Sequence, residues 1–387
     1  MIGHAMIPGM NTPHRFAFPT TIHFGPGARH LVADHLKSQG VKRPLVVTDK
    51  GLAVLPILHD FAEELEGLDV KVYAGVAGNP VRKQVDDGVA AFKAHRADAV
   101  VGFGGGAALD VAKAVALMAV HEGDVLQYAW DHPQVLPVTR PLPYFIALPT
   151  TSGTGSEVGR SAVISDDATH VKKVIFNPVL LAKAVFADPE LTLDLPAPVT
   201  AATGMDALTH NVESYLSPEY HPLCDGIALE GARIAARSLE NAVRHPRDIA
   251  ARSDMMMASM MGAIAFQKDL GAVHSCAHAL GTVVDMHHGL ANGIMIDHVM
   301  RFNRAAAEAK MGDLAWACGA GSTAGDFVTW LTELKSRVGI PARLGERGVN
   351  AQHVPRLVEV ACADTCHKTN PRPCARADFE SIFTAAL

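Results

Sequence analysis

The chain has 387 residues, of which 49% are hydrophobic and 19% are charged, and its formal net charge is −6. This length fits roughly two domains of ordinary size and is long enough to bury a large core. The mildly acidic balance gives no electrostatic reason to bind nucleic acid or an anionic membrane, and no apolar run reaches the ~18–20 residues of a membrane span.

The N-terminus and the cysteines indicate the compartment. Residues 1–19 lack a charged segment followed by a long apolar one, so no signal peptide is predicted and a loose N-terminal arm is expected. Six cysteines in a chain of this length do not suggest a disulfide framework, and the cytoplasm is the expected location. Three thiols and an imidazole lie close in sequence, namely Cys362, Cys366, His367 and Cys374. Without a CxxC pair they are interpreted as ordinary residues, with a zinc site as the alternative.

The first half of the chain alternates between short apolar runs and helix-forming segments. Strands are predicted at residues 18–24, 44–49, 70–73, 97–103 and 143–148. Helices are predicted between them at residues 28–38, 53–66, 81–95 and 107–119. This alternation indicates a mostly parallel sheet covered by helices.

The pattern changes after Pro196, where few β-branched runs intervene. Helices are predicted at residues 199–216, 222–241, 249–267, 270–285, 289–301, 305–317, 323–338, 354–366 and 376–387. The sequence therefore predicts an α/β domain over residues 1–195 and an all-helical domain over residues 196–387.

Two loops that follow predicted strands suit phosphate or ribose groups. Gly104-Gly105-Gly106 stands between a strand and a helix, where glycines let an anion approach and the helix N-terminus offers free N–H groups. The stretch PTTSGTGSE (149–157) adds five hydroxyls after the next strand. A tight structural turn and a flexible polar loop are the alternatives. Residues 102–107 also satisfy G-x-G-x-x-A, but this match is discounted because it is far from the first strand.

Asp49 ends a buried strand. A carboxylate at a strand tip can accept hydrogen bonds from the adenosine ribose hydroxyls and repels a 2′-phosphate, which favours NAD over NADP. A turn-capping aspartate is the alternative interpretation.

Histidines and one carboxylate recur at helical spacing in the second half. Asp206 and His210 are four residues apart, as are His274 and His278, and His288 precedes a glycine. Side chains four apart share one face of a helix. A carboxylate with several imidazoles suits a first-row divalent metal with an open position. A lone helical histidine is more often structural, but two such pairs and a His-Gly turn favour a metal site.

Several separated segments resemble the iron-containing (group III) alcohol dehydrogenase family, from about Phe16 to the C-terminus. They are GGGAALDVAK (104–113), PTTSGTGSEV (149–158), ADPELTLDLPAPVTAATGMDALTHNVESYLS (187–217), HSCAHALG (274–281), HHGLANGIMIDHVMRFN (287–303) and NPRP (370–373). The resemblance implies an N-terminal dinucleotide-binding α/β domain, an all-α C-terminal domain, and an active site in the cleft between them.

The resemblance also implies roles for individual residues. The implied metal ligands are Asp206, His210, His274 and His288, with Fe(II) as the first choice of ion and Zn(II) as the alternative. His278 would lie beside the nicotinamide and the substrate and relay the proton, which makes His278, Asp206 and His274 the expected catalytic residues. The residues implied along NAD are Asp49, Asn79, Gly105, Gly106, Asp110, Thr150, Thr151, Thr154, Lys172 and Leu191.

The implied reaction is hydride transfer between nicotinamide and a primary alcohol, or a small hydroxy acid, held at the metal. A glycerol dehydrogenase-like enzyme and a dehydroquinate synthase-like lyase of the same superfamily are the alternatives, and a non-catalytic metal- or nucleotide-binding protein is a third. The PTTSGTGSE and GMDALTH segments favour the alcohol dehydrogenase branch. The expected partners are a small alcohol or aldehyde and further copies of the chain in a homo-oligomer.

The chain departs from the family pattern at two positions. Ala107 replaces a usual serine, so one hydroxyl to the phosphate would be missing while the backbone donors remain. Arg160 stands where a small or hydroxyl residue is more usual. Its charge is expected either to face a substrate carboxylate or phosphonate or to form a surface ion pair, and both interpretations stay open.

Overall fold

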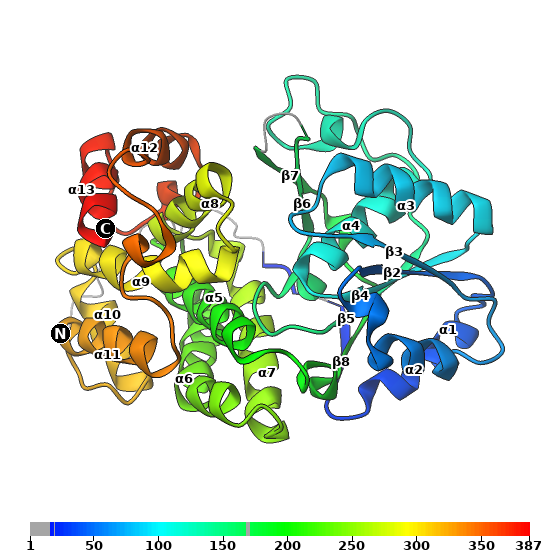
Figure 1. Cartoon of the computed structure of the whole chain (residues 1–387), viewed down its shortest axis with the longest axis horizontal. Helices are drawn as coiled ribbons and strands as arrows, with labels where there is room; N and C mark the ends of the chain where they lie inside the picture. Colours follow the sequence, from blue (N-terminus) through cyan, green and yellow to red (C-terminus); the bar gives the residue numbers. More distant parts are fainter. Residues whose placement is uncertain (1–15, 19, 168–170) are drawn as a thin grey trace, which may run out of the picture.

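The computed structural model describes residues 16–18, 20–167 and 171–387, so most of the predicted N-terminal arm lies outside the described residues. Figure 1 shows an α/β part on the right, built from the first half of the chain, and a helical part on the left. The predicted fold class is therefore confirmed. The exact domain limits stay a prediction; the last strand ends at Ala187 and the next long helix begins at Ala197.

Six parallel strands of the described residues form one sheet in the order β1-β8-β5-β4-β2-β3. They are β1 (Thr21–Phe24), β2 (Pro44–Asp49), β3 (Lys71–Val76), β4 (Ala99–Gly104), β5 (Tyr144–Pro149) and β8 (Ala184–Ala187). The chain first adds β3 outside β2 and then returns to place β4 on the other side of β2. The loops after β2 and β4 therefore diverge, which opens the kind of crevice where parallel sheets bind ligands.

Helices cover both faces of this sheet. They are α1 (Val32–Ser38), α2 (Pro56–Glu64), α3 (Arg82–His95) and α4 (Gly106–Met118). Successive residues of a strand point to opposite faces. Val47 packs into the apolar cluster of α3 and α4, whereas Val46 packs into that of α1 and α2. The central strands are buried on both sides, which explains their continuous apolar runs.

Two of the predicted helices of this part begin later than predicted. The predicted helix at 28–38 begins as a 3-10 turn over Ala28–Leu31 before α1. The one predicted at 53–66 begins at Pro56, because a proline disfavours helical geometry in the residue before it. A separate antiparallel pair, β6 (Ser161–Ser165) and β7 (Lys172–Phe176), follows the PTTSGTGSE loop.

The second half is helical throughout its described length. Its helices are α5 (Ala197–Leu216), α6 (Pro222–Arg244), α7 (Ile249–Ala265), α8 (Ala272–Val284), α9 (His288–Asn303), α10 (Glu308–Ala317), α11 (Ala324–Arg337), α12 (Val354–Ala363) and α13 (Arg376–Ala386). Among the residues that the structure describes, no helix is both long and apolar enough to span a membrane.

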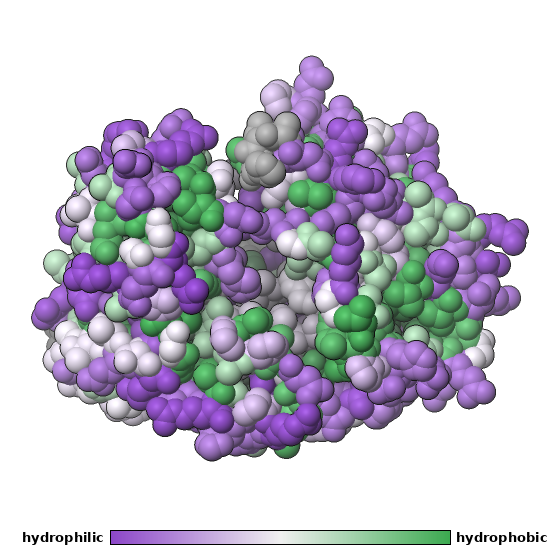
Figure 2. Space-filling model, in the orientation of Figure 1, coloured by the Kyte–Doolittle hydropathy of each residue, from purple (hydrophilic) through white to green (hydrophobic). Residues whose placement is uncertain are grey.

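Helix α7 joins the two parts. Met256, Met260 and Ala263 pack into the apolar cluster formed by the sheet, α3 and α4, while Met255 and Ala258 of the same helix pack into the helical core. The two halves are therefore held against each other by a shared apolar contact. Figure 2 shows the surface hollowed where they meet.

Candidate functional site

Four side chains that lie far apart in sequence converge in the helical part. The ligand atoms of this cluster all lie within 4.8 Å of one another, and the residues are Asp206, His210, His274 and His288. Helix α5 supplies the first two, α8 the third, and the first turn of α9 the fourth. The i, i+4 spacing places Asp206 and His210 on one face of α5, as the sequence predicts.

A close approach of two helices brings His288 to Asp206. The next residue, Gly289, packs so tightly that a Cβ there would lie 2.4 Å from the backbone oxygen of Ala202 in α5. Only glycine permits this contact, since real Cβ atoms essentially never come so near a backbone atom. Nε2 of His288 lies 3.5 Å from Oδ1 of Asp206 as a result.

A second carboxylate orients His274. Nδ1 of His274 donates to Oε2 of Glu213 at 2.6 Å, and Oε1 of Glu213 accepts from the backbone N–H of Val273 at 2.7 Å. The proton on Nδ1 leaves Nε2 with a free lone pair, directed toward Asp206 Oδ1 at 3.9 Å. A carboxylate behind an imidazole is the usual support of a metal-binding histidine.

The other two histidines are held neutral by burial. Burial lowers the pKa of His210 to about 4, against the opposing effect of Asp206. Burial, with Lys172 next in effect, holds the pKa of His288 well below its usual range. Among the described residues, Nδ1 of His210 and Nδ1 of His288 find no hydrogen-bond partner. Neutral imidazoles are the form that binds a metal.

Asn292 shows that the cluster has more lone pairs than donors. Its Nδ2 donates to Oδ1 of Asp206 at 2.6 Å and lies 3.3 Å from Nε2 of His274 and 3.2 Å from Nε2 of His288. An amide nitrogen carries two hydrogens and cannot serve three acceptors. Converging lone pairs with too few donors fit a divalent cation, so the residues present suit the predicted metal, although its binding stays a prediction.

His278 stands beside the cluster and has its own partner. Its Nδ1 donates to Oδ2 of Asp364 at 2.8 Å, and its ring stacks on His288 with centroids 5.3 Å apart. Burial would raise the pKa of Asp364, but His278 and the donors Ser275 and Cys366 hold it well below its usual range. This pairing fixes the ring of His278 with Nε2 available for a proton.

The thiol alternative is not supported by the geometry. Among the described residues, the four side chains Cys362, Cys366, His367 and Cys374 do not come together as one group of metal-ligand atoms. Cys366 instead lies with His278 and Asp364, their ligand atoms within 4.8 Å of one another.

Asp49 caps a turn, as one of the two interpretations from the sequence has it, and its contact with the ribose stays a prediction. Its Oδ1 accepts from the backbone N–H of Leu52 at 2.9 Å, which caps the turn after β2. Its Oδ2 faces the neighbouring strand tip, 3.4 Å from where a Cβ on Gly104 would lie. A cavity of about 320 Å³ opens here, and its walls include Asp49, Gly51, Gly78, Gly105 and Ala108.

The two loops predicted for phosphate lie side by side. A Cβ on Gly105 would lie 3.2 Å from Cγ2 of Thr151, and one on Gly106 would lie 2.7 Å from Thr154. The backbone N–H of Thr150 donates to the carbonyl of Gly104 at 3.1 Å. Side chains in place of these glycines would fill the space between the loops, at the start of α4 where an anion is best bound.

The remaining residues implied along the cofactor have different surroundings. Asp110 holds the loop rather than facing open space, since its oxygens accept from Ser156 Oγ at 2.6 Å and Val163 N at 2.9 Å. Leu191 is buried in the apolar cluster of α1 and α2. Asn79 reaches the helical part, where its Nδ2 donates to Asp285 Oδ1 at 3.1 Å.

Lys172 also faces the helical part, and its Nζ lies 3.6 Å from where a Cβ on Gly281 would be. Burial lowers the pKa of this ammonium, whereas Asp206 and three other carboxylates favour its charged form. The amino group of Lys172 therefore interacts electrostatically with Asp206 of the cluster.

Three residues of the site were not predicted from the sequence. Glu213 follows His210 by three positions and Asn292 follows His288 by four, so helical spacing could have found both. No spacing in the sequence relates Asp364 to His278. The packing of α12 against α8 brings the two residues together. The neighbouring histidines His287 and His298 lie outside the cluster.

One carboxylate and three imidazoles brought together in a chain that also has a parallel sheet with glycine-rich loops fit the class of oxidoreductases that use a metal and a dinucleotide. Residues 19–189 match the family model described as iron-containing alcohol dehydrogenase, and residues 200–387 match the C-terminal model of the same family. The chain belongs to the iron-containing alcohol dehydrogenase family, and it is an oxidoreductase.

Relatives cover nearly the whole chain. It is 38% identical over 379 residues to a 4-hydroxybutyrate dehydrogenase of Cupriavidus necator, covering 95% of this chain and 98% of the relative. It is 34% identical to an NAD-dependent methanol dehydrogenase of Bacillus methanolicus, covering 96% and 99%. The crystal structure of a 1,3-propanediol oxidoreductase superposes with a TM-score of 0.92 at 37% identity, covering 97% of this chain and 100% of the other.

Proposed function

We propose that the protein is an NAD-dependent, divalent-metal-dependent alcohol dehydrogenase that also reduces the corresponding aldehydes. The observation that carries this proposal is the cluster of Asp206, His210, His274 and His288. Asp206, His210 and His274 are buried, Glu213 orients His274, and the cluster is deficient in hydrogen-bond donors. The proposed substrate is a primary alcohol or a small hydroxy acid.

The chain's own residues would bind and orient the reactants. Asp206 and the three imidazoles would hold the metal, and Asp49 with the glycine and threonine loops would hold NAD. When bound, the metal supplies a Lewis acid for the alcohol oxygen and the nicotinamide accepts the hydride. Fe(II) is the first choice and Zn(II) the alternative, since such a ligand set suits several first-row ions.

His278 would move the proton. Asp364 holds Nδ1 of His278 in its protonated tautomer, so Nε2 can accept a proton released from the alcohol. The ring lies against His288, within reach of a reactant held at the cluster. Asp364 is thus proposed as a positioning residue, and His278 as the residue that carries the proton.

The names of the relatives support this function without fixing the substrate. They act, by name, on 4-hydroxybutyrate, methanol and 1,3-propanediol, which all carry a primary alcohol. A glycerol dehydrogenase-like enzyme would instead oxidise a secondary alcohol. A dehydroquinate synthase-like lyase would regenerate its NAD in each turnover, so net formation of NADH from simple alcohols separates it from a dehydrogenase.

Replacing a metal ligand tests the proposal. His274→Ala and His288→Ala should lose bound metal, measured by elemental analysis, and should lose turnover, measured by NADH absorbance. The control is His245→Ala, because His245 is an exposed residue at the end of α6 and belongs to none of the possible metal-binding groups of the described residues. Full activity in a metal-free preparation of either ligand variant would contradict the proposed function.

A further inference from the structure

A buried ammonium group links α4 to the chain that follows β5. Lys113 lies in α4, and only 1% of its surface is exposed. Its Nζ donates to the carbonyl oxygen of Ser156 at 2.7 Å, to the hydroxyl of Ser156 at 2.8 Å and to the carbonyl oxygen of Ser161 at 2.7 Å. An ammonium has three hydrogens, so these acceptors use all of them. A buried charge that is hydrogen-bonded in this way fixes the position of its partners.

Asp110, about one turn earlier on α4, completes this network. Its Oδ1 lies 3.8 Å from Nζ of Lys113 and accepts from the hydroxyl of Ser156 at 2.6 Å. Its Oδ2 accepts from the backbone N–H of Val163 at 2.9 Å. Residues three apart share one face of a helix, so a single face of α4 holds residues 156–163 through both charges. Removing the ammonium would leave the buried carboxylate without its cation, which is unfavourable.

The network reaches the two loops proposed for NAD through Ser156 and Thr154. The backbone N–H of Ser156 donates to Oγ1 of Thr154 at 3.2 Å. Thr154 in turn lies 2.7 Å from where a Cβ on Gly106, the first residue of α4, would be. The start of α4 thus offers free N–H groups to an anion, and about two turns further on the same helix holds the loop that faces them. One rigid helix therefore sets the width of the space between the loops.

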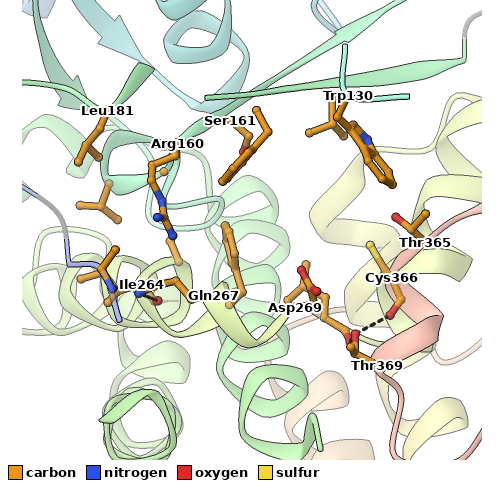
Figure 3. Close-up of a pocket in the computed structure, with 18 of the residues that line it drawn as sticks. Trp130, Arg160, Ser161, Leu181, Ile264, Gln267, Asp269, Thr365, Cys366 and Thr369 are labelled. Atoms are coloured by element: carbon orange, nitrogen blue, oxygen red, sulfur yellow. Dashed lines mark hydrogen bonds between the residues drawn. The ribbon is translucent and has the colours of Figure 1, made fainter. Parts of the chain in front are cut away.

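The segment that Lys113 holds also borders open space. A cavity of about 590 Å³ is lined in part by Val158, Gly159, Arg160 and Ser161, and Figure 3 shows Arg160 and Ser161 at its wall. The segment continues into β6, which pairs with β7 along one edge. A segment beside a cavity lacks close packing on that side, so its hydrogen bonds to α4 contribute more to its position.

We propose that Lys113 is a positioning residue for the cofactor, which holds the PTTSGTGSE loop at the distance from the start of α4 that the pyrophosphate of NAD requires. The proposal rests on the proposed function, which assigns NAD to these loops. Lys113 acts without touching NAD, since all three hydrogens of its ammonium are used within the protein. A residue with this role affects the affinity for a pyrophosphate, whereas one that only stabilises the fold does not discriminate between ligands.

The test compares two ligands in Lys113→Met, which keeps an apolar stem of similar length but removes the ammonium. Calorimetric titration of the holoenzyme with ADP-ribose should show an affinity about 10–100-fold lower than that of the wild type, as expected for the loss of charge-assisted hydrogen bonds. Adenosine carries no phosphate, so its affinity should be the same in both proteins. The KM for NAD should rise by the factor found for ADP-ribose, whereas kcat at saturating NAD should stay near that of the wild type.

Ser156→Ala is a milder variant that keeps the test valid if Lys113→Met does not fold. It removes only the hydroxyl between Asp110 and Lys113, and the carbonyl of residue 156 still accepts from the ammonium. Its melting temperature should stay close to that of the wild type, while its affinity for ADP-ribose should fall about threefold to tenfold. The matched control is Lys93→Met, because Lys93 is an exposed lysine of α3, and both affinities should equal those of the wild type.

Two results would overturn the proposal while leaving the cofactor assignment intact. One is an affinity for ADP-ribose in the folded variants equal to that of the wild type. The other is an equal loss of affinity for ADP-ribose and adenosine, which would show a general loss of structure. Failure of the proposed function is distinguishable, because a wild type that bound no ADP-ribose and reduced NAD with no alcohol would overturn that function and this proposal together.

Discussion

The two sides of the proposed active site, which would hold the metal and the cofactor, are built on different physical principles. On the metal side, α5, α8 and α9 pack so closely that the position of each ligand follows from helix packing, and Glu213 fixes the ring of His274. On the cofactor side, backbone groups of loops after β2, β4 and β5 converge at a sheet edge. The metal side tolerates little displacement, whereas the cofactor side depends on space and on free N–H groups.

One glycine from each side, Gly289 and Gly105, illustrates this difference in tolerance. A Cβ on Gly289 would meet the backbone of α5 at 2.4 Å, and a helix backbone cannot rotate away. A Cβ on Gly105 would meet the methyl group of Thr151 at 3.2 Å, and that side chain can adjust. A substitution that disturbs packing should therefore displace site residues more on the metal side than on the cofactor side.

The largest effect is expected from Gly289→Ala. Pushing α9 away from α5 separates His288 from Asp206, and overpacking of this kind costs about 1–3 kcal/mol of stability. Metal titration should show an affinity lower by at least ~100-fold, since one of four ligands is displaced. Gly226→Ala in α6 is the control, because nothing lies within 4 Å of its added Cβ. Normal metal affinity in Gly289→Ala would show that the helices adapt as readily as the loops.

A smaller loss is expected from Glu213→Gln. The amide keeps the shape of the side chain but removes the charge that orients and polarises His274, and support of this kind is worth about 10–100-fold in metal affinity. Calorimetric titration with Zn(II) and Co(II) measures the change without relying on turnover. Glu308→Gln on the exposed surface of α10 should leave metal affinity unchanged.

An unchanged affinity in Glu213→Gln would mean that packing alone orients the ligands. The difference between the two sides would then be greater, because hydrogen bonds would contribute nothing to the affinity of the metal side for its ion. If Glu213→Gln lost more metal affinity than Gly289→Ala, the charge of Glu213 would matter more for metal binding than the packing of α9 against α5.

Whether a residue of the site could be predicted depends on how far apart in the sequence the interacting residues lie. Helical spacing is local, so Asp206, His210, His274 and His278 could be found as pairs, and the parallel sheet followed from alternating strands and helices. Which histidine joins the cluster depends on tertiary packing, and the resemblance to the family supplied it. The partnership of His278 with Asp364 spans 86 residues and depends on how α12 packs on α8, which no sequence pattern encodes.

The cofactor side was less predictable for the same reason. Asp110 matched a family motif, yet its carboxylate bonds Ser156 and the backbone of Val163. A loop is specified by such particular contacts rather than by a period, so a motif gives the place of a residue without the direction of its side chain.

The smallest effect is expected from Asp49→Asn, which separates the two interactions of this side chain. An asparagine can still accept from the N–H of Leu52, so the turn after β2 and the melting temperature should be preserved. The loss of charge removes the repulsion of a 2′-phosphate. The ratio of kcat/KM with NADP to that with NAD should therefore rise about tenfold, or ~1.4 kcal/mol.

Asp49→Ala completes this test, because it removes the cap together with the charge. It should raise the ratio by a similar factor and also lower the melting temperature. If Asp49→Asn left the ratio unchanged while Asp49→Ala lowered stability, turn capping would be the sole role of this carboxylate. Selection of NAD over NADP would then have to come from the backbone of the glycine loops. The cofactor side would then depend on its shape, much as the metal side depends on the packing of its helices.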